Sequence, residues 1–171
     1  MRATVELIAN GRLADAGLVN ICNAAGVSRG ALYHHFPSIA ELVAEVHSQA
    51  QDRVRALADD SFADGGADAP ARFSTALGRA LTDDQLVRAG MRLASDGTDT
   101  PPRLREAMLD RVRAEVLTEA PERPDQKVLA DLAVVVTAGL ESLGYTDTAW
   151  WSRESTERIW DMLLPLFKEA G

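Results

Sequence analysis

The residues best suited to chemistry lie in the run GVSRGALYHHF, from Gly26 to Phe36. Leu32 and Phe36 are four residues apart, so on a helix they point together into a core. The opposite face then carries polar and cationic side chains. Arginine can pair with guanine or phosphate, while tyrosine and histidine can donate hydrogen bonds to phosphate oxygens. The residues on this face that suit contact with nucleic acid are Arg29, Gly30, Tyr33, His34 and His35.

A helix-turn-helix over residues 18–36 is the element that must position this face. A short helix is predicted from about Leu18 to Ala24, and Gly26 supplies a backbone that can take φ > 0 in the tight turn after it. Val27 is expected to be buried beneath the turn, and Ser28 is suited to cap the next helix. The pattern therefore predicts a compact head in which the second of two crossed helices displays the candidate residues.

Gly30 is an unusual choice for an early helical position, where glycine costs about 1 kcal/mol relative to alanine. That cost is tolerable where a bulky neighbour, such as a phosphodiester backbone, must come close to the helix. His34 and His35 are adjacent, so they diverge by roughly 100° on a helix and cannot both bind one metal ion. We therefore expect a nucleic-acid face rather than a metal site.

Motifs of enzymatic chemistry are missing from the sequence. It contains no glycine-rich phosphate loop, no nucleophile elbow and no HExxH, and its three histidines all fall within the first 47 residues. The single cysteine, Cys22, excludes a disulfide framework and is expected to be a small core residue in a reducing cytoplasm. The sequence predicts a protein that is not an enzyme and needs no metal or cofactor.

Beyond the head, apolar residues recur at helical spacing along the whole chain, which predicts an all-α fold. A head at 1–37 is expected to join a larger helical body at 38–171 through a helix at 38–57. SFADGGADAP, residues 61–70, is expected to be a loop. Asp83 and Asp84 suit the first turn of a helix. The remaining predicted helices span 71–81, 84–95, 102–118, 127–143 and 153–169.

The last two predicted helices have more apolar surface than a monomer of this size readily covers. We therefore expect helices 127–143 and 153–169 to build a four-helix interface in a homodimer. The longest apolar stretch, residues 128–140, contains Asp131 and is shorter than the roughly 20 residues of a membrane span. Glu6 also falls where a signal peptide would be apolar, so neither a membrane nor secretion is indicated.

A pocket for a small apolar effector is expected between the body helices. Helix phase alone suggests which residues would line it, although methionines at such positions are more often core filler than pocket wall. The candidates are Val87, Met91, Met108, Val112, Thr137 and Trp160.

Charge limits the way in which the chain could contact DNA. The formal net charge is −8, which does not suit non-specific coating of nucleic acid. Residues 1–50 hold three arginines, one of which is Arg12, against four acids, one of which is Asp15, a net charge of −1. Any DNA contact must therefore be local and weakly dependent on salt.

The segment from Ala24 through Glu41 to Val43, with AAGVSRGALYHHF and ELV, resembles the second, third and fourth helices of TetR-type repressors. The resemblance implies that the helix from Ser28 to Phe36 enters the major groove of a palindromic double-stranded operator. It also implies which residues contact the DNA: Ser28, Arg29, Gly30, Tyr33, His34 and His35. Family members usually carry a Thr or Ser with a basic neighbour at the second helix and a Lys at the fourth. Here those places hold Gly17, Leu18 and Ile39, so we expect weaker DNA binding unless a basic arm precedes Met1.

A second resemblance lies in QLVRAGMRLASDG, residues 85–97, and RIWDMLLPLF, residues 158–167. Both look like segments of actinomycete γ-butyrolactone receptors, a TetR subgroup that senses lactone signals. Those receptors usually place a tryptophan over the ligand on the helix after the proline-rich break. Residues 101–119 contain no aromatic residue here, so an apolar effector other than a lactone fits as well.

Two functions remain open from the sequence. The first is a cytoplasmic, dimeric, ligand-responsive repressor whose effector separates the two recognition helices from the operator. The alternative is a dimeric small-molecule-binding or interaction protein on the same scaffold, in which DNA binding is weak or lost.

Overall fold

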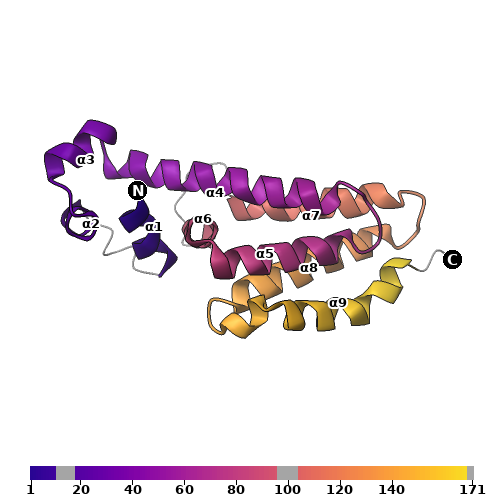
Figure 1. The fold of residues 1–171 in the computed structure, drawn as a ribbon. Helices are drawn as coiled ribbons and strands as arrows, with labels where there is room; N and C mark the ends of the chain where they lie inside the picture. Colours follow the sequence, from indigo (N-terminus) through magenta and orange to yellow (C-terminus); the bar gives the residue numbers. More distant parts are fainter. Residues whose placement is uncertain (11–17, 96–103, 169–171) are drawn as a thin grey trace. The chain divides into compact units, whose positions relative to one another are not determined.

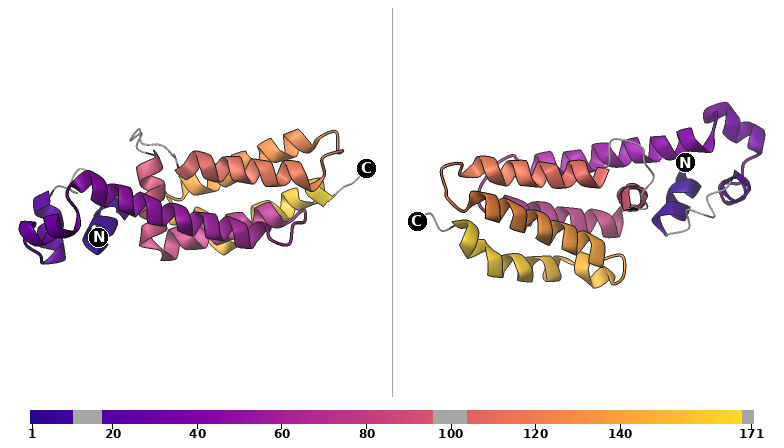
Figure 2. Two further views of the ribbon diagram at one scale, coloured as in Figure 1. Left: turned by 90° about the horizontal axis from the view of Figure 1, so that it is seen from above. Right: turned by 180° about the vertical axis from the view of Figure 1, so that it is seen from behind.

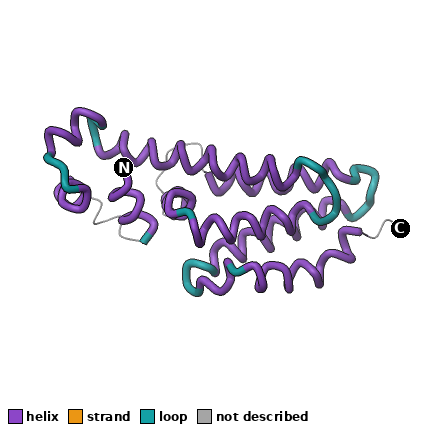
Figure 3. The backbone as a smooth tube through the Cα atoms, viewed as in Figure 1, coloured by secondary structure: helices purple, strands orange, loops and turns teal. Residues whose placement is uncertain are grey.

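The computed structural model describes residues 1–10, 18–95 and 104–168, and within these ranges the chain forms helices and no strand (Figures 1 and 3). The all-α prediction is therefore confirmed. Arg12, Asp15, Gly17 and the connection between the predicted helices 84–95 and 102–118 lie outside the described residues. The helices are α1 (Arg2–Ala9), α2 (Leu18–Ala25), α3 (Arg29–His35), α4 (Ile39–Phe62), α5 (Ala69–Asp83), α6 (Gln85–Ser95), α7 (Leu104–Glu119), α8 (Gln126–Leu143), the 3-10 turn η2 (Thr148–Trp151) and α9 (Arg153–Lys168).

Helix ends differ from the sequence prediction mainly around the glycine pair at 65–66. The loop predicted over 61–70 is shorter, because α4 continues to Phe62 and α5 begins at Ala69. Pro70 lies in the first turn of α5. Backbone N–H groups in the first turn of a helix have no partner within the helix, so proline, which lacks an N–H, is tolerated there. At the other end of α5, Asp84 caps α6 by accepting hydrogen bonds from the N–H groups of Leu86 at 2.9 Å and Val87 at 3.4 Å.

The chain divides into two compact units. Unit 1 contains residues 1–53 and 84–104, and unit 2 contains residues 54–83 and 105–171. The predicted head at 1–37 falls in unit 1 together with α6, and α4 contributes residues to both units. The functional boundary at residue 37 stays a prediction.

Unit 1 has a small core formed by the first four helices. Its buried members are Ile21, Cys22, Leu32 and Leu42, and partly buried apolar side chains, among them Ile39, pack against them. The free thiol of Cys22 is therefore a core group, as expected. Within the same unit α1 packs against α6, and α6 approaches α4 closely at Gly90.

Unit 2 is a helical bundle in which α5 packs against α8 and α9 (Figure 2). Small residues allow these elements to approach closely. A Cβ at Gly78 would lie 2.7 Å from the backbone oxygen of Trp151, so only glycine fits there. The hydroxyl oxygens of Ser74 and Thr137 lie 3.1 Å apart in the buried space between α5 and α8.

Among the described residues, no helix is long and apolar enough to cross a membrane.

A buried ion pair connects α7 and α8 within unit 2. Nε of Arg105 donates to Oε2 of Glu141 at 2.8 Å, and the Glu141 side chain is only 1% exposed. Burial raises the pKa of the Glu141 carboxyl above its ordinary value, and the hydrogen bond and charge of Arg105 partly offset that rise. Arg105 therefore compensates a buried charge.

Candidate nucleic-acid interface

The turn between α2 and α3 has the hydrogen bonds of a glycine-ended helix. The N–H of Val27 donates to the oxygen of Cys22 at 3.1 Å, and the N–H of Gly26 donates to the oxygen of Asn23 at 3.3 Å. Gly26 has φ +65°, a left-handed conformation that glycine adopts at little cost. These two bonds end α2 and direct the chain into α3, as the sequence predicted.

Serine side chains begin the next two helices. The Oγ of Ser28 accepts a hydrogen bond from the N–H of Ala31 at 3.2 Å, and the Oγ of Ser38 accepts one from the N–H of Glu41 at 3.1 Å. Each bond satisfies a backbone donor that the first turn of a helix would otherwise leave unpaired. The two caps fix the start of α3 and of α4, and the cap at Ser28 is the one predicted above.

One side of α3 is anchored in the core of unit 1, and the other side is exposed. Leu32 is buried, and Phe36 packs partly buried against the same core. Val27 was expected to be buried but is 40% exposed. The turn is held by its backbone hydrogen bonds instead, so the sequence prediction for this side chain was wrong.

The predicted DNA-contacting residues share the exposed side of this segment. Tyr33 is 47% exposed, so its ring and hydroxyl group are accessible to a partner. The rings of the two histidines at the end of α3 meet edge to face, with centroids 5.4 Å apart. All six candidates are exposed: Ser28, Arg29, Gly30, Tyr33, His34 and His35.

Gly30 has no packing reason to be glycine within the described part of the chain. A Cβ at this position would meet only the Oγ of Ser28, at 3.9 Å, which is an ordinary van der Waals contact. By contrast, a Cβ at Gly90 would lie 2.2 Å from the Cβ of Ala50. Gly90 therefore serves helix packing inside unit 1, whereas the space above Gly30 is open.

The phosphate anchors expected of a DNA-binding head are few. Arg2 and Arg29 are both exposed, and Glu6 and Glu41 are exposed in the same unit. Ile39, at the position where a lysine was expected, packs against the core. The structure thus gives this apolar residue a packing role that the sequence comparison did not foresee.

The six residues proposed to line an effector pocket are all buried, but they do not belong to one unit. Val87 and Met91 lie on α6 in unit 1, whereas Met108, Val112, Thr137 and Trp160 lie in unit 2. Of these, Thr137 is hydrogen-bonded to Ser74 as described above, and Trp160 packs edge to face on Phe167 with centroids 5.6 Å apart. The list stays a prediction.

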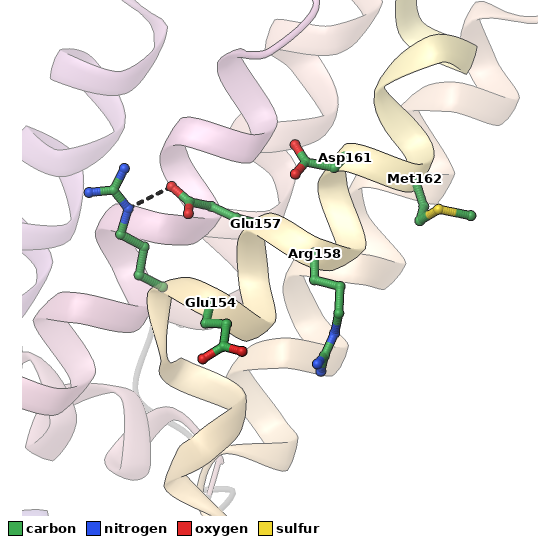
Figure 4. Close-up of a pocket in the computed structure, with 6 residues that line it drawn as sticks. Glu154, Glu157, Arg158, Asp161 and Met162 are labelled. Carbon is green, nitrogen blue, oxygen red and sulfur yellow. Dashed lines mark hydrogen bonds and ion pairs between the residues drawn. The ribbon is translucent and has the colours of Figure 1, made fainter.

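Two hollows in unit 2 are lined by other residues. One is an open groove along the charged side of α9, where Arg153 and Glu157 form an ion pair (Figure 4). The second is a small cavity of about 40 Å³ at the ends of several helices, lined in part by Phe62, Glu119 and Phe167. Sequence reasoning missed this cavity, because its walls come from segments far apart along the chain.

The comparisons with known proteins agree with this arrangement. Residues 1–46 match the family model described as "Bacterial regulatory proteins, tetR family". This is a family of regulators and not of enzymes, in agreement with the sequence prediction. No curated protein matches the chain.

Solved structures match nearly the whole chain. A γ-butyrolactone receptor, an ArpA-like protein, has a TM-score of 0.78 at 20% identity, over 94% of this chain and 82% of its own. The TetR family protein CprB from S. coelicolor A3(2) has a TM-score of 0.70 at 22% identity, over 94% and 83%. A transcriptional regulator from Rhodococcus sp. Rha1 has a TM-score of 0.69 at 22% identity, over 97% and 92%.

CprB has also been solved in complex with its biological operator sequence, and that structure matches 96% of this chain with a TM-score of 0.67 at 23% identity. At such identities the likeness establishes the fold, while the family model identifies the amino-terminal segment. Residues 1–46 therefore match the tetR family of bacterial regulatory proteins, and the chain as a whole has the fold of the TetR family protein CprB and the γ-butyrolactone receptors.

Proposed function

We propose that this protein is a homodimeric transcriptional regulator that binds a palindromic operator through α3 and is released from it by a small molecule. The observation that carries the proposal is the polarity of α3. Its buried side holds Leu32, while its exposed side presents six residues able to contact DNA. This helix lies inside the segment that matches the tetR family model.

In the proposed complex the two α3 helices of a dimer occupy successive major grooves, about 34–36 Å apart. Arg29 contacts guanine or phosphate, and Tyr33 and the two histidines donate hydrogen bonds to phosphate oxygens. The open space above Gly30 admits the sugar–phosphate backbone. Such a role belongs in the cytoplasm, where operator DNA is found.

The proposed dimer forms through α8 and α9. On α8, Val128 and Val135 are seven residues apart and are 67% and 66% exposed, and on α9 Met162 is 79% exposed. Figure 4 shows Met162 extending away from its helix. Large apolar side chains exposed on neighbouring helices favour a protein interface over open solvent. A four-helix contact between two copies would cover them.

Effector release requires two states of the protein with different affinities for the effector. We infer that α4 transmits the change, because residues 39–53 of this helix belong to unit 1 and residues 54–62 belong to unit 2. A small effector bound among the body helices would shift α4 and thereby change the separation of the two α3 helices in the dimer.

An electrophoretic mobility shift with the DNA upstream of the protein's own coding sequence tests the proposal. We expect a specific shift at low salt. Replacing Arg29 by alanine should weaken it roughly ten- to hundredfold, the loss typical of a base-contacting arginine. Arg79→Ala is the matched control, since Arg79 is 84% exposed on α5 and outside the candidate interface.

The control should bind as the unaltered protein does. If a folded dimer gives no specific shift at low salt, DNA binding through α3 is refuted. If Arg29→Ala and Arg79→Ala weaken binding equally, the protein binds DNA through its overall charge and not through a specific contact of α3.

The head's charge supports a second candidate function, a dimeric small-molecule-binding protein that no longer recognises DNA. Residues 1–50 carry a net charge of −1, and Ile39 packs against the core where a phosphate-binding lysine was expected. Thermal stabilisation by a ligand, combined with a failure to shift any operator, would favour this function over the first.

A further inference from the structure

The small cavity in unit 2 lies where the ends of α4, α5, α7, α8 and α9 meet. Four apolar side chains form much of its inner wall, Phe62, Val116, Leu129 and Phe167, and the buried Gln126 also lines it. Its volume of about 40 Å³ corresponds to roughly three water-sized positions. The space therefore suits a short alkyl chain or the edge of one ring, and a larger ligand would extend outward.

A carboxylate is held at the edge of this cavity. The Oε1 of Glu119 accepts a hydrogen bond from the N–H of Gly66 at 2.9 Å. A Cβ at Gly65 would lie 3.1 Å from its Oε2, so the carboxylate rests against the loop. Arg72 steadies the same loop by donating to the backbone oxygens of Gly65 at 2.6 Å and Ser61 at 3.1 Å.

Glu119 differs from Glu115 and Asp68 because no arginine or lysine pairs with it in the described part of the chain. Glu115, which also lines the cavity, accepts a hydrogen bond from Arg111 at 2.5 Å. Asp68 is paired with Arg72 at 2.5 Å. Among the acids that line the cavity, Glu119 is therefore the one without a cation partner in the described part of the chain, and its hydrogen bond to Gly66 leaves lone pairs able to accept others.

We propose that this cavity is a binding site for a small amphipathic cation, with its ammonium group against Glu119 and its apolar part among the four inner side chains. The site is preformed, since the loop that carries Gly66 is fixed without a ligand, and this lowers the cost of binding. This inference rests on the proposed function in one respect, because it takes the bound cation to be the effector of the proposed regulator.

The cavity shares none of the six residues that the sequence suggested for the effector. It also differs from the groove along α9, whose lining comes from one helix and is largely charged. A short alkyl ammonium would bury its chain, which stabilises binding by roughly 0.8 kcal/mol for each methylene removed from water. Its charge would meet an acceptor that no other cation occupies.

Three probes with the same chain and different head groups test the proposal: n-butylammonium, n-butanol and n-butanoate. The readout is an amide NMR titration of the purified full chain, in which the Gly66 amide reports on Glu119 directly. We expect n-butylammonium to bind about fivefold more tightly than n-butanol and n-butanoate to bind most weakly. The Gly66 amide should shift most strongly with the ammonium probe.

Glu119→Gln should reduce the preference for n-butylammonium over n-butanol to about one. The matched control is Glu122→Gln, because Glu122 is exposed just beyond α7 and does not line the cavity; it should preserve the preference. Ala120→Leu adds bulk to the cavity wall and should abolish binding of both probes, while the thermal midpoint shows that the chain remains folded.

Equal binding of the three probes, an unchanged preference in Glu119→Gln, or no saturable binding at all would each overturn the proposal. The last result would mean that the cavity holds only water. The titration contains no DNA, so its failure does not bear on operator binding. A failed mobility shift, in turn, leaves the cation site intact.

Discussion

At the scale of single residues, Gly30 is a position where the stability of the fold and the proposed DNA binding favour different side chains. It lies in a helix, where glycine is unfavourable, and a Cβ there would meet only the Oγ of Ser28, at 3.9 Å. Neither a positive φ nor close packing in the described residues requires it. Under the proposed function, the close approach of the DNA backbone would explain a glycine here.

Gly30→Ala should therefore stabilise the fold by up to about 1 kcal/mol and at the same time weaken operator binding. Denaturant unfolding and fluorescence anisotropy with labelled operator measure the two effects. Ser48→Ala, at an exposed position on α4, is the control and should improve helix propensity without changing affinity. Unchanged operator affinity in Gly30→Ala would show that DNA does not approach α3 at this point.

Glu141 gives the protein a pH-dependent contribution to stability. Burial raises the pKa of its carboxyl in the folded state above the value in the unfolded chain, against the opposing effect of Arg105. The folded state thus holds its proton more tightly than the unfolded state. Its contribution is fully present below the unfolded pKa and is lost as the pH rises through the folded pKa.

The free energy of unfolding of Glu141→Gln, measured relative to the unaltered protein, should therefore increase from acidic to neutral pH. The amide oxygen of glutamine can still accept from Arg105, and it carries no charge to desolvate. Urea unfolding at several pH values measures this difference. Glu122→Gln, at an exposed position, is the control. A difference that is constant with pH would contradict the assigned shift.

At the scale of elements, α8 and α9 combine a buried side with an exposed apolar one. On α8, Ala133 and Thr137 face the bundle, whereas Val128 and Val135 face outward. Helical periodicity predicted both helices, and their excess of apolar residues predicted a partner. A dimer interface through α8 and α9 requires exposed apolar side chains on these two helices, and Val128, Val135 and Met162 meet that requirement. Exposed apolar residues without a common role would be scattered singly over the surface.

Val135→Glu should convert the dimer to a monomer, because two carboxylates would be buried without partners at a two-fold contact. Sedimentation velocity on the purified chain measures the change. Ala56→Glu, at an exposed position on α4, adds the same charge outside the proposed interface and should leave the dimer intact. A dimer that survives Val135→Glu would place the interface elsewhere.

At the scale of the whole molecule, the negative net charge of the chain disfavours non-specific DNA binding, so any binding must depend on specific contacts. The chain carries a net charge of −8, so attraction to DNA in general is weak and the few cations of the head must act locally. Residues 1–50 contain three arginines. A dimer that used all of them would release counterions at no more than six phosphates.

The slope of log affinity against log salt concentration should therefore be no steeper than about −5, at about 0.9 for each phosphate contact. Anisotropy titrations between about 50 and 200 mM salt give this slope. Arg29→Ala should make it shallower by nearly two, since each protomer loses one contact, whereas Arg79→Ala should leave it unchanged. A slope near −10 would show that further cations contact the DNA.

The sequence by itself determined the helix-turn-helix and the order of the helices, because both depend on neighbouring residues. Gly26 and the caps at Ser28 and Ser38 act within a few residues of their partners. The apolar period of each helix is equally local. Helix ends near the glycine pair at 65–66 were less predictable, since packing decides where a last turn stops.

Only the tertiary structure decided which side chains meet across long stretches of sequence. Arg105 and Glu141 are 36 residues apart, and Gly66 and Glu119 are 53 apart. No pattern along the chain distinguishes a buried glutamate from a solvated one, or an exposed Val27 from a buried one. Burial and cavity shape arise from contacts among distant segments, so the exposed side of α3 could be predicted from the sequence while the cavity in unit 2 could not.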